Sequence, residues 1–373
     1  MSTQKKQHYV PKCYLKNFAN NKLCSIFNQY SCKIIENIPY SDQCQSDYFY
    51  GEDLIVENKL QEKESIWGNV FQKIINNDIL TDKDIKDLKL FAIYQRMRTK
   101  AENDHINKMG EQVAEYVNNF NSQFTDSKYF IYENITPAEY LSESIKLETI
   151  IDDLDLLIID YNTQKPLITS DAPVIVINPF YPSIGFSLIG LIIYFPVNPN
   201  KLIVLYDCKV YSKYNGCRYI ESSDEKEVAH LNSTQYIMSD KIVLSKTSNI
   251  LYNFGGKVKK LRMRNIKHNN IDIMGNPQKQ QIIHHSARKL YYEYEFSFGK
   301  LPKSIKQIPK NCRDMLPRQY DQKWAERILI HKPETMLDLY SKNIIKIPDI
   351  KNKKQLLKGI GNMTNFVKKY WDI

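Results

Sequence analysis

The sequence predicts an α+β fold, in which N-terminal helices pack on a mixed or antiparallel β-sheet and a basic, mainly helical C-terminal region follows. Helix-length segments with one apolar face occupy most of residues 53–148. Short strand-like runs then dominate residues 154–244. Helices followed by strands are typical of α+β folds, whereas α/β folds alternate the two.

The N-terminal part begins with a stretch, residues 8–50, that mixes aromatic, polar and short apolar runs and predicts short strands or loops lying on the body. A first helix is expected over about 53–75. A second, opened by the N-cap cluster Thr81-Asp-Lys-Asp84, should run toward residue 121 with a break near Gly110. Thr136 followed by Pro137 predicts a third helix that continues to about residue 148.

The second part of the body is rich in short apolar runs bounded by Pro, Asn, Gly and Asp. The runs predicted as strands are 154–159, 166–169, 174–177, 191–195, 202–206 and 242–244. One helix is expected among them, at about 223–233. Gly255-Gly256 then marks a domain boundary, which separates a body of residues 1–255 from a C-terminal region of residues 256–373.

The C-terminal region should contain helical pieces near residues 280–292, 319–330 and 353–370. Its aromatic run, residues 291–298, would place Tyr292, Tyr294, Phe296 and Phe298 on one face if it formed a strand. These rings could stack on bases, but core packing is the commoner role for such a run.

Charge is distributed unevenly along the chain. The net charge is +10, yet residues from Lys257 onward carry 26 Lys and Arg against 10 Asp and Glu, which is +16, and residues 1–256 carry 26 against 32, which is −6. An AT-rich coding sequence would raise Lys throughout but would not remove acidic residues from one part only. The asymmetry favours nucleic acid as a partner of the C-terminal region. The best candidates for phosphate contacts are Lys257, Lys259, Lys260, Arg262 and Arg264.

Other bulk features suggest a cytoplasmic protein. The longest apolar stretch, residues 184–197, is shorter than a membrane span and is interrupted by glycine and proline, and the first residues lack the apolar core of a secretory signal. The seven cysteines are scattered without a Cys-x-x-Cys pair, which favours free thiols over a disulfide framework or a zinc ribbon.

Two carboxylates in the first helix are the strongest candidates for chemistry. Glu57 and Glu64 share a helical face with Trp67, Phe71 and Ile74, so both should point inward, about 10 Å apart along the axis. A buried carboxylate is costly unless it is paired, protonated or bound to a metal. The pair therefore predicts either a metal or substrate site, or interior ion pairs with an arginine of the next helix.

Arg98 is the basic residue best placed for either role. It is seven residues from His105, and the two are expected to share one helical face. Their Arg-x6-His spacing resembles the catalytic pattern of HEPN-type ribonucleases. The simpler expectation is that Arg98 pairs with Glu57 or Glu64 and that His105 is exposed. His8, near the start of the chain, is a candidate general base or metal ligand, or a hydrogen-bonded structural histidine.

Asp171 lies between two strand-like runs, where a rigid sheet could aim it into an active site. Ser-Asp-x-Pro is equally good turn chemistry, so both interpretations stay open. The chain contains no P-loop, dinucleotide-binding fingerprint, His-Glu-x-x-His or Gly-x-Ser-x-Gly sequence. Nucleotide hydrolysis, zinc-dependent proteolysis and lipase chemistry therefore receive no support.

Several of these segments, in this order, resemble a bacterial family known as domain of unknown function 4238. The matching pieces are His8-Tyr-Val-Pro11 with Tyr14, Leu15 and Phe18; Glu57, Leu60 and Glu64; Gln95, Arg98 and Thr99; Thr169-Ser-Asp-Ala-Pro173; Phe195-Pro-Val-Asn-Pro199; and Asn232 with Tyr236. The resemblance covers about residues 7–247. The chain departs from the family at Ala172, where asparagine is usual.

The resemblance implies a bacterial cytosolic protein of an anti-phage defence locus, without a known reaction. Its polar motif positions are His8, Glu57, Glu64, Arg98 and Asp171. If these five converge, Glu57, Glu64 and Asp171 could hold Mg²⁺ or Mn²⁺ for phosphodiester hydrolysis, Arg98 could bind the phosphate and His8 could act as base.

The resulting hypothesis is a toxic nuclease of phage defence, with RNA favoured over DNA as substrate. Two alternatives stay open: a non-catalytic sensor of phage nucleic acid or protein, and a toxin that consumes a nucleotide. The sequence identifies neither the phage trigger nor the oligomeric state, and a homo-oligomer is compatible with it.

Overall fold

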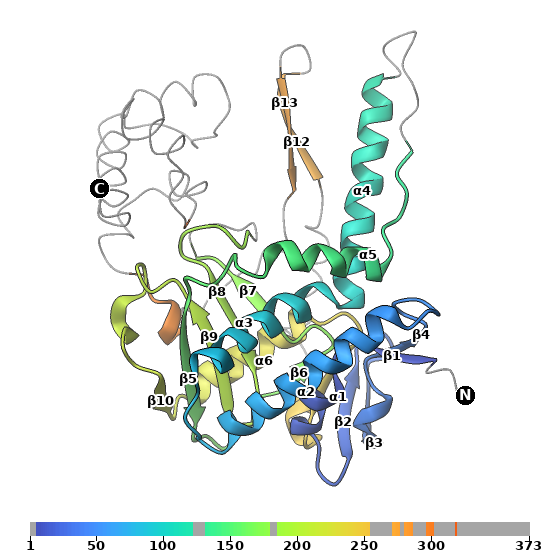
Figure 1. Cartoon of the computed structure of the whole chain (residues 1–373). Helices are drawn as coiled ribbons and strands as arrows, with labels where there is room; N and C mark the ends of the chain where they lie inside the picture. Colours follow the sequence, from blue (N-terminus) through green and yellow to red (C-terminus); the bar gives the residue numbers. More distant parts are fainter. Residues whose placement is uncertain are drawn as a thin grey trace, which may run out of the picture.

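The computed structural model describes residues 5–121, 131–179, 185–253, 271–276, 280–285, 296–301 and 318. These residues form helices together with mixed and antiparallel sheets, which confirms the predicted α+β fold (Figure 1). The boundary at Gly255-Gly256 and the helical pieces expected at 319–330 and 353–370 lie outside the described residues.

The larger sheet has five strands in the order β10-β5-β9-β8-β7, and only the β10–β5 pair is parallel. Its strands are β5 (Asp155–Tyr161), β7 (Ile175–Ile177), β8 (Ile192–Pro196), β9 (Lys201–Tyr206) and β10 (Tyr219–Ser222). The three central strands are continuous apolar runs because both faces of this sheet are covered. The edge strand β10, which is exposed and has few apolar residues, was not predicted.

The second sheet is antiparallel, with the order β3-β2-β11-β6. Its strands are β2 (Leu23–Asn28), β3 (Lys33–Pro39), β6 (Thr169–Ser170) and β11 (Ile242–Ser245). Successive residues of β11 serve two cores: Leu244 joins the main core, and Val243 packs with Tyr236 behind the sheet. A short pair, β1 (Lys6–His8) with β4 (Gln45–Asp47), ends the N-terminal part.

Helices cover these sheets on two sides. In Figure 1 the helices α2 and α3 lie across the front of the molecule and α6 lies behind the strands. The helices are α1 (Lys12–Leu15), α2 (Ile55–Ile75), α3 (Asp82–Met97), α4 (Lys100–Asn121), α5 (Pro137–Ser142) and α6 (Glu225–Met238). The 3-10 turns are Lys16–Phe18, Tyr40–Asp42, Glu143–Leu147, Ser212–Tyr214, Asn249–Asn253 and Ser297–Gly299.

The main core is centred on Phe91 of α3. Its ring centroid lies 5.6 Å from that of Tyr14, 5.4 Å from Trp67, 4.9 Å from Phe71 and 5.1 Å from Phe195. These rings come from α1, α2, α3 and β8, so one aromatic cluster joins the helices to the larger sheet. The inward direction predicted for Trp67 and Phe71 is confirmed, since both are buried.

The long second helix predicted from residue 81 is divided at a different place from the one expected. The division falls at Arg98 and Thr99, where Arg98 caps α3 and the Thr99 hydroxyl accepts a hydrogen bond from the Glu102 N–H at the start of α4. The break predicted at Gly110 was wrong. A Cβ at that position would lie 2.0 Å from the Tyr132 ring, so glycine serves close packing there.

The helix predicted over 280–292 was also wrong in its first half. Residues Gln280–His285 form strand β13, which pairs with β12 (Ile271–Asn276). The third predicted helix ends early, since α5 gives way to a 3-10 turn at Glu143.

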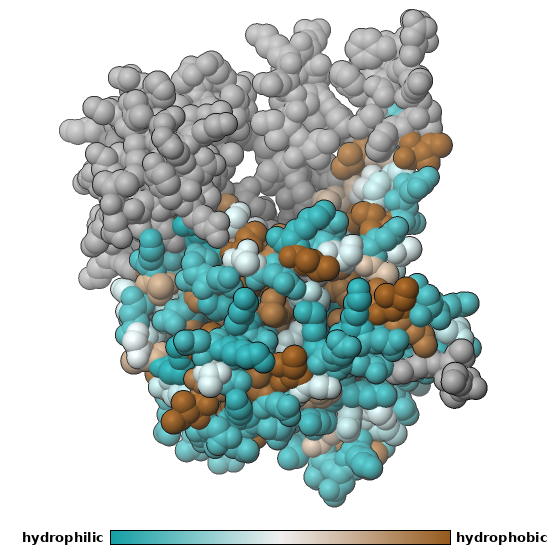
Figure 2. All heavy atoms as spheres, viewed as in Figure 1, coloured by the Kyte–Doolittle hydropathy of each residue, from teal (hydrophilic) through white to brown (hydrophobic). Residues whose placement is uncertain are grey.

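The face shown in Figure 2 is mostly hydrophilic, with separate small groups of apolar residues. Among the described residues, no helix is long and apolar enough to cross a membrane. Within the same part of the chain, Cys13, Cys24, Cys32, Cys44, Cys208 and Cys217 are free thiols.

Candidate functional site

Arg98 joins three segments of the chain that are distant in sequence. It lies at the end of α3, is 1% exposed, and donates from Nη2 to Glu64 Oε1 at 2.8 Å and to the His8 carbonyl. Its Nε donates to the Tyr50 hydroxyl at 3.1 Å. The guanidinium therefore connects α2, β1 and the turn after β4. The sequence expectation that Arg98 pairs with Glu57 or Glu64 is confirmed for Glu64.

The remaining terminal nitrogen of Arg98 differs from its other donors. Nη1 is buried and makes no hydrogen bond among the described residues. A guanidinium has five N–H donors, so two of them, on one nitrogen, are available in the interior. Leaving a charged donor unsatisfied costs more than the 1–3 kcal/mol of a neutral group. Arg98 and the groups around it, which are Glu57, Glu64, Tyr50 and the His8 backbone, are called the Arg98 cluster. Within this cluster, Nη1 is the best-placed donor for an anionic ligand or a water molecule.

The two carboxylates of α2 differ in environment. Glu64 is ion-paired with Arg98, and its side chain is 19% exposed. Glu57 is 6% exposed, and burial together with the nearby Glu64 carboxylate raises its pKa above the usual range, while Arg98 acts in the opposite direction. The Gln61 side chain makes a hydrogen bond to Glu57. The prediction that both carboxylates turn inward is confirmed, more fully for Glu57 than for Glu64.

His8 contributes its backbone to the cluster, while its ring has another partner. The ring Nε2 lies 2.8 Å from the Ser41 carbonyl, to which it donates as a neutral imidazole. Burial lowers the pKa of His8 to about 4, despite the opposing effect of the Ser41 hydrogen bond. The ring is therefore neutral near pH 7.

Three residues that were not proposed as site residues complete the cluster. The Gln7 Oε1 accepts from the Tyr50 N–H at 2.5 Å, and Gln95 Nε2 donates to the Tyr9 carbonyl at 3.0 Å. The Oε1 atom of Gln95 is buried without a hydrogen-bond partner among the described residues. Gln95 could have been found from its position three residues before Arg98, one helical turn away. No sequence signal connected Tyr50 to this site.

Asp171 lies in a different environment. Its two carboxylate oxygens accept backbone N–H bonds from Asp240 at 2.9 Å, Lys241 at 2.6 Å and Ile242 at 2.9 Å, so it fixes the turn between α6 and β11. Burial raises the pKa of Asp171 to about 6, and the three N–H donors limit the rise. The carboxylate has a structural role, but the turn that it caps is distant in the sequence, whereas the turn interpretation expected Asp171 to bond its own backbone.

The neighbours of Asp171 in its motif are also cross-links between elements. Ser170 Oγ donates to Gln235 Oε1 at 2.8 Å, and the Tyr14 hydroxyl lies 2.9 Å from Thr169 Oγ1. Asn232 accepts from the Ile168 N–H and donates to the Pro166 carbonyl. The Thr-Ser-Asp segment therefore attaches the smaller sheet to α1 and α6.

The predicted metal ligands do not form one donor set. Among the described residues, no group of three or more His, Cys, Asp or Glu side chains is placed to hold a metal ion. Glu57 and Glu64 lie in the Arg98 cluster, whereas both oxygens of Asp171 are bonded to the backbone. Binding of Mg²⁺ or Mn²⁺ remains a prediction, and no chemical step below depends on it.

The Arg-x6-His pattern does not lie on one helical face. Arg98 caps α3, whereas His105 belongs to α4 and is half-buried. The proposed phosphate contacts Lys257, Lys259, Lys260, Arg262 and Arg264 lie outside the described residues. The catalytic roles of His8, Glu57, Glu64, Arg98 and Asp171 remain predictions.

Removal of the guanidinium should be far more destabilising than removal of the Glu57 charge. In Arg98→Met, Glu64 and the His8 carbonyl lose their donor, and we expect the free energy of unfolding to fall by about 3–5 kcal/mol. In Glu57→Gln, a buried charge beside a second carboxylate disappears, so stability should be unchanged or higher. Denaturant unfolding at pH 7 measures both. Equal losses of unfolding free energy in the two variants would contradict the difference expected between Arg98 and Glu57.

Acid sensitivity should depend on His8. Because its folded-state pKa is about 4, below the ordinary 6.5, its contribution is complete above pH 6.5 and is lost as pH falls toward 4. The loss is about 3 kcal/mol for a shift of this size. Replacing His8 by Gln, which keeps an N–H donor for Ser41, should flatten the decline of Tm between pH 6.5 and 4.5. Parallel Tm profiles of the two proteins would refute this assignment.

Comparison with known proteins agrees with the motif order. The family model for a protein of unknown function, DUF4238, matches residues 6–249, which is more than half of the chain and includes the Arg98 cluster and the Asp171 cross-link. No curated protein and no solved structure matches the chain. The chain belongs to the DUF4238 family.

Proposed function

We propose that this protein cleaves nucleic acid as an effector of bacterial defence against phage, with RNA as the preferred substrate. The reacting groups would be Glu57 and Arg98, and Glu64 would orient the guanidinium. The basic C-terminal region would hold the phosphate backbone.

The observation that supports this proposal most is the pair of spare donors on Arg98 within a carboxylate cluster. The other Arg98 donors are engaged by protein groups, which hold Nη1 in a fixed orientation. Two N–H donors on one nitrogen can bind a phosphate oxygen and stabilise the charge that develops on it during cleavage. Glu64 is the most exposed of the charged groups in the cluster, so a substrate would enter past its side chain.

Glu57 has the properties of a general base. Its raised pKa brings proton transfer closer to neutral pH than an ordinary carboxylate allows. In RNA, Glu57 would take the proton of the 2′-hydroxyl while O2′ bonds to phosphorus. The P–O5′ bond would break, and O5′ would take a proton from water. DNA lacks this internal nucleophile, which is the reason for preferring RNA.

The charge asymmetry supports the choice of a polyanionic substrate. The region from Lys257 onward carries +16, and basic residues that contact phosphates give binding that weakens steeply as salt rises.

A non-catalytic nucleic-acid sensor is the second candidate. The observation in its favour is that the His8 ring and the Asp171 carboxylate are both occupied by backbone groups, as structural residues would be. In that case the Arg98 cluster would only stabilise the fold, and the basic region alone would bind the ligand.

Cleavage of a single-stranded RNA and of the same sequence as DNA separates these candidates. We expect the full chain to cut RNA and leave 2′,3′-cyclic phosphate ends in the presence of EDTA. Glu57→Gln should lose at least about 100-fold in rate, the usual contribution of a general base. Cleavage that requires Mg²⁺ or Mn²⁺ and leaves 3′-hydroxyl ends would instead support the hydrolysis predicted from the sequence.

The matched control is Glu62→Gln, the same chemical change at an exposed position of α2. It should retain full cleavage and RNA binding. RNA binding without cleavage by the wild type would favour the sensor, and full activity of Glu57→Gln would exclude Glu57 as the base. Release of nicotinamide from NAD by the wild type, but no RNA cleavage, would support a nucleotide-consuming toxin.

A further inference from the structure

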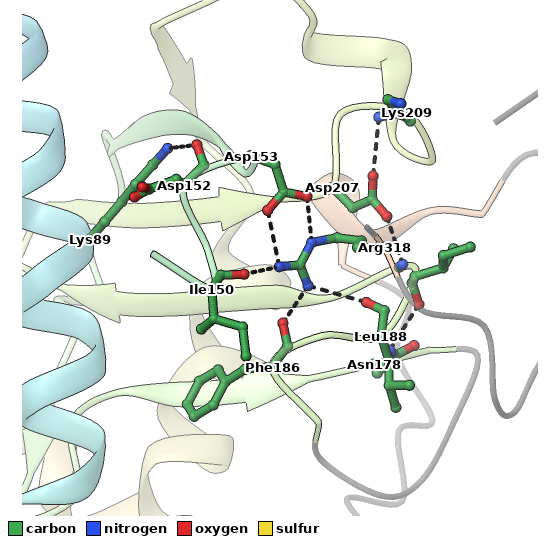
Figure 3. Close-up of polar contacts among 12 residues, drawn as sticks. Lys89, Ile150, Asp152, Asp153, Asn178, Phe186, Leu188, Asp207, Lys209 and Arg318 are labelled. Atoms are coloured by element: carbon green, nitrogen blue, oxygen red, sulfur yellow. Dashed lines mark hydrogen bonds and ion pairs between the residues drawn. The ribbon is translucent and has the colours of Figure 1, made fainter. Parts of the chain in front are cut away.

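Arg318 inserts into a socket on the body whose residues are distant from it in the sequence (Figure 3). Its Nε donates to Asp153 Oδ2 at 2.7 Å and its Nη2 to Asp153 Oδ1 at 3.1 Å, which is a two-point carboxylate contact. Nη2 also donates to the Ile150 carbonyl, and Nη1 donates to the carbonyls of Phe186 and Leu188. The Arg318 side chain is fully buried, whereas that of Asp153 is 39% exposed.

All five N–H donors of Arg318 therefore have acceptors. The plane of the guanidinium and its fork of donors match this arrangement, which an ammonium group cannot reproduce. Arg98 differs in this respect, because one of its nitrogens has no hydrogen-bond partner in the described part of the chain. One carboxylate and three carbonyls accept all the N–H groups of the guanidinium, which is the composition expected of a guanidinium-binding site.

The walls of the socket are held by contacts that do not involve Arg318. Asp207 Oδ2 accepts from the Gly190 N–H at 2.8 Å, and Asn178 donates to the Ile189 carbonyl at 2.9 Å, which together position the segment that carries the 186 and 188 carbonyls. On the other side, Lys89 Nζ donates to the Asp152 carbonyl at 2.6 Å. These contacts should keep the socket formed when the arginine is removed, while the loss of its hydrogen bonds to the 186 and 188 carbonyls should make local opening of that segment more frequent.

A second contact attaches the same part of the chain to the body. Glu227 of α6 accepts from the Ser297 N–H at 2.7 Å. Phe296 and Phe298 are buried, with ring centroids 5.7 and 5.6 Å from that of Tyr194. At both contacts an acidic residue of the body accepts a hydrogen bond from a group beyond residue 295, which is a guanidinium at Asp153 and a backbone N–H at Glu227.

We propose that the socket formed by Asp153 and the carbonyls of Ile150, Phe186 and Leu188 is a guanidinium-binding site, and that its occupation by Arg318 fastens the basic region to the body. Arg318 lies beyond the part of the chain that the family model matches. The family-matched body therefore carries a receptor for its own C-terminal region. This holds whether or not the chain cleaves nucleic acid.

Chemical rescue of the full-length Arg318→Ala variant tests the site. Its Tm should lie below that of the wild type, and ethylguanidinium should restore part of the loss in a saturable way. The concentrations used are those that leave the wild-type Tm unchanged. Ethylammonium, with the same charge but without the planar fork, should restore nothing. The Arg318→Ala/Asp153→Asn double variant should not respond to either compound.

Lys300→Ala is the matched control, because Lys300 is an exposed cation of the same region. Its Tm should equal that of the wild type, without a response to ethylguanidinium. If Arg318→Ala does not fold, Arg318→Lys replaces it, and backbone amide exchange over residues 186–190 should be at least several-fold faster than in the wild type. An unchanged exchange rate in Arg318→Lys, or equal rescue by the two compounds, would overturn the proposal.

Discussion

The hydrogen bonds of Arg98 connect three parts of this fold that are distant from one another in the sequence. The N-terminal strand β1 is only three residues long and pairs with an equally short β4, so its own ladder holds it weakly. Arg98 binds the carbonyl of His8 in β1, the Tyr50 hydroxyl after β4 and the Glu64 carboxylate in α2. Burial disfavours its charge, but Tyr50 and Glu64 outweigh that effect and raise its pKa above the usual value. One guanidinium thus joins the N-terminal segment, α2 and α3 by hydrogen bonds, in addition to their packing in the main core.

The two buried arginines of the described residues illustrate two uses of one chemical group. Every guanidinium N–H of Arg318 donates to a group of the body, so this residue attaches its part of the chain to the body. Arg98 makes three side-chain hydrogen bonds that fix its position, and its Nη1 has no hydrogen-bond partner among the described residues. Completely satisfied polar groups stabilise a unique arrangement, whereas incompletely satisfied ones are the expected locations of ligands. By this criterion Arg98 is the candidate for ligand binding, whereas the role of Arg318 is structural.

Most of the fold prediction rested on the spacing of apolar residues along the sequence. The inward face of α2 and the continuous apolar runs of β8 and β9 follow from residue spacing, and both are confirmed. The division between α3 and α4 could not be located in this way. It depends on the Thr99 cap, whereas Gly110, where the break was expected, lies within α4 and packs against a tyrosine ring in a tertiary contact. Strand β10 was missed for the same reason, because its pairing partner rather than its own composition makes it a strand.

The site was predicted in part. Glu64 and Arg98 were expected to meet, because a buried carboxylate needs a partner and the next helix offered an arginine. Asp171 was grouped with them because it lies between two strand-like runs and is a polar motif position of the family. Neither property shows whether a carboxylate faces a cavity or three backbone N–H groups. No feature of the sequence indicated that Tyr50 belongs to the site. Arg318 could not have been singled out among the many cations of its region, since only the socket distinguishes it.

The most direct test of the central role of Arg98 is a double-mutant cycle with Glu64. Denaturant unfolding of the wild type, Arg98→Met, Glu64→Gln and the double variant gives the coupling energy between the two side chains. Contacting residues in a buried network should couple by more than about 1 kcal/mol, in the sense that the second substitution costs less than the first. Effects that add within about 0.5 kcal/mol, the behaviour of independent sites, would contradict the account.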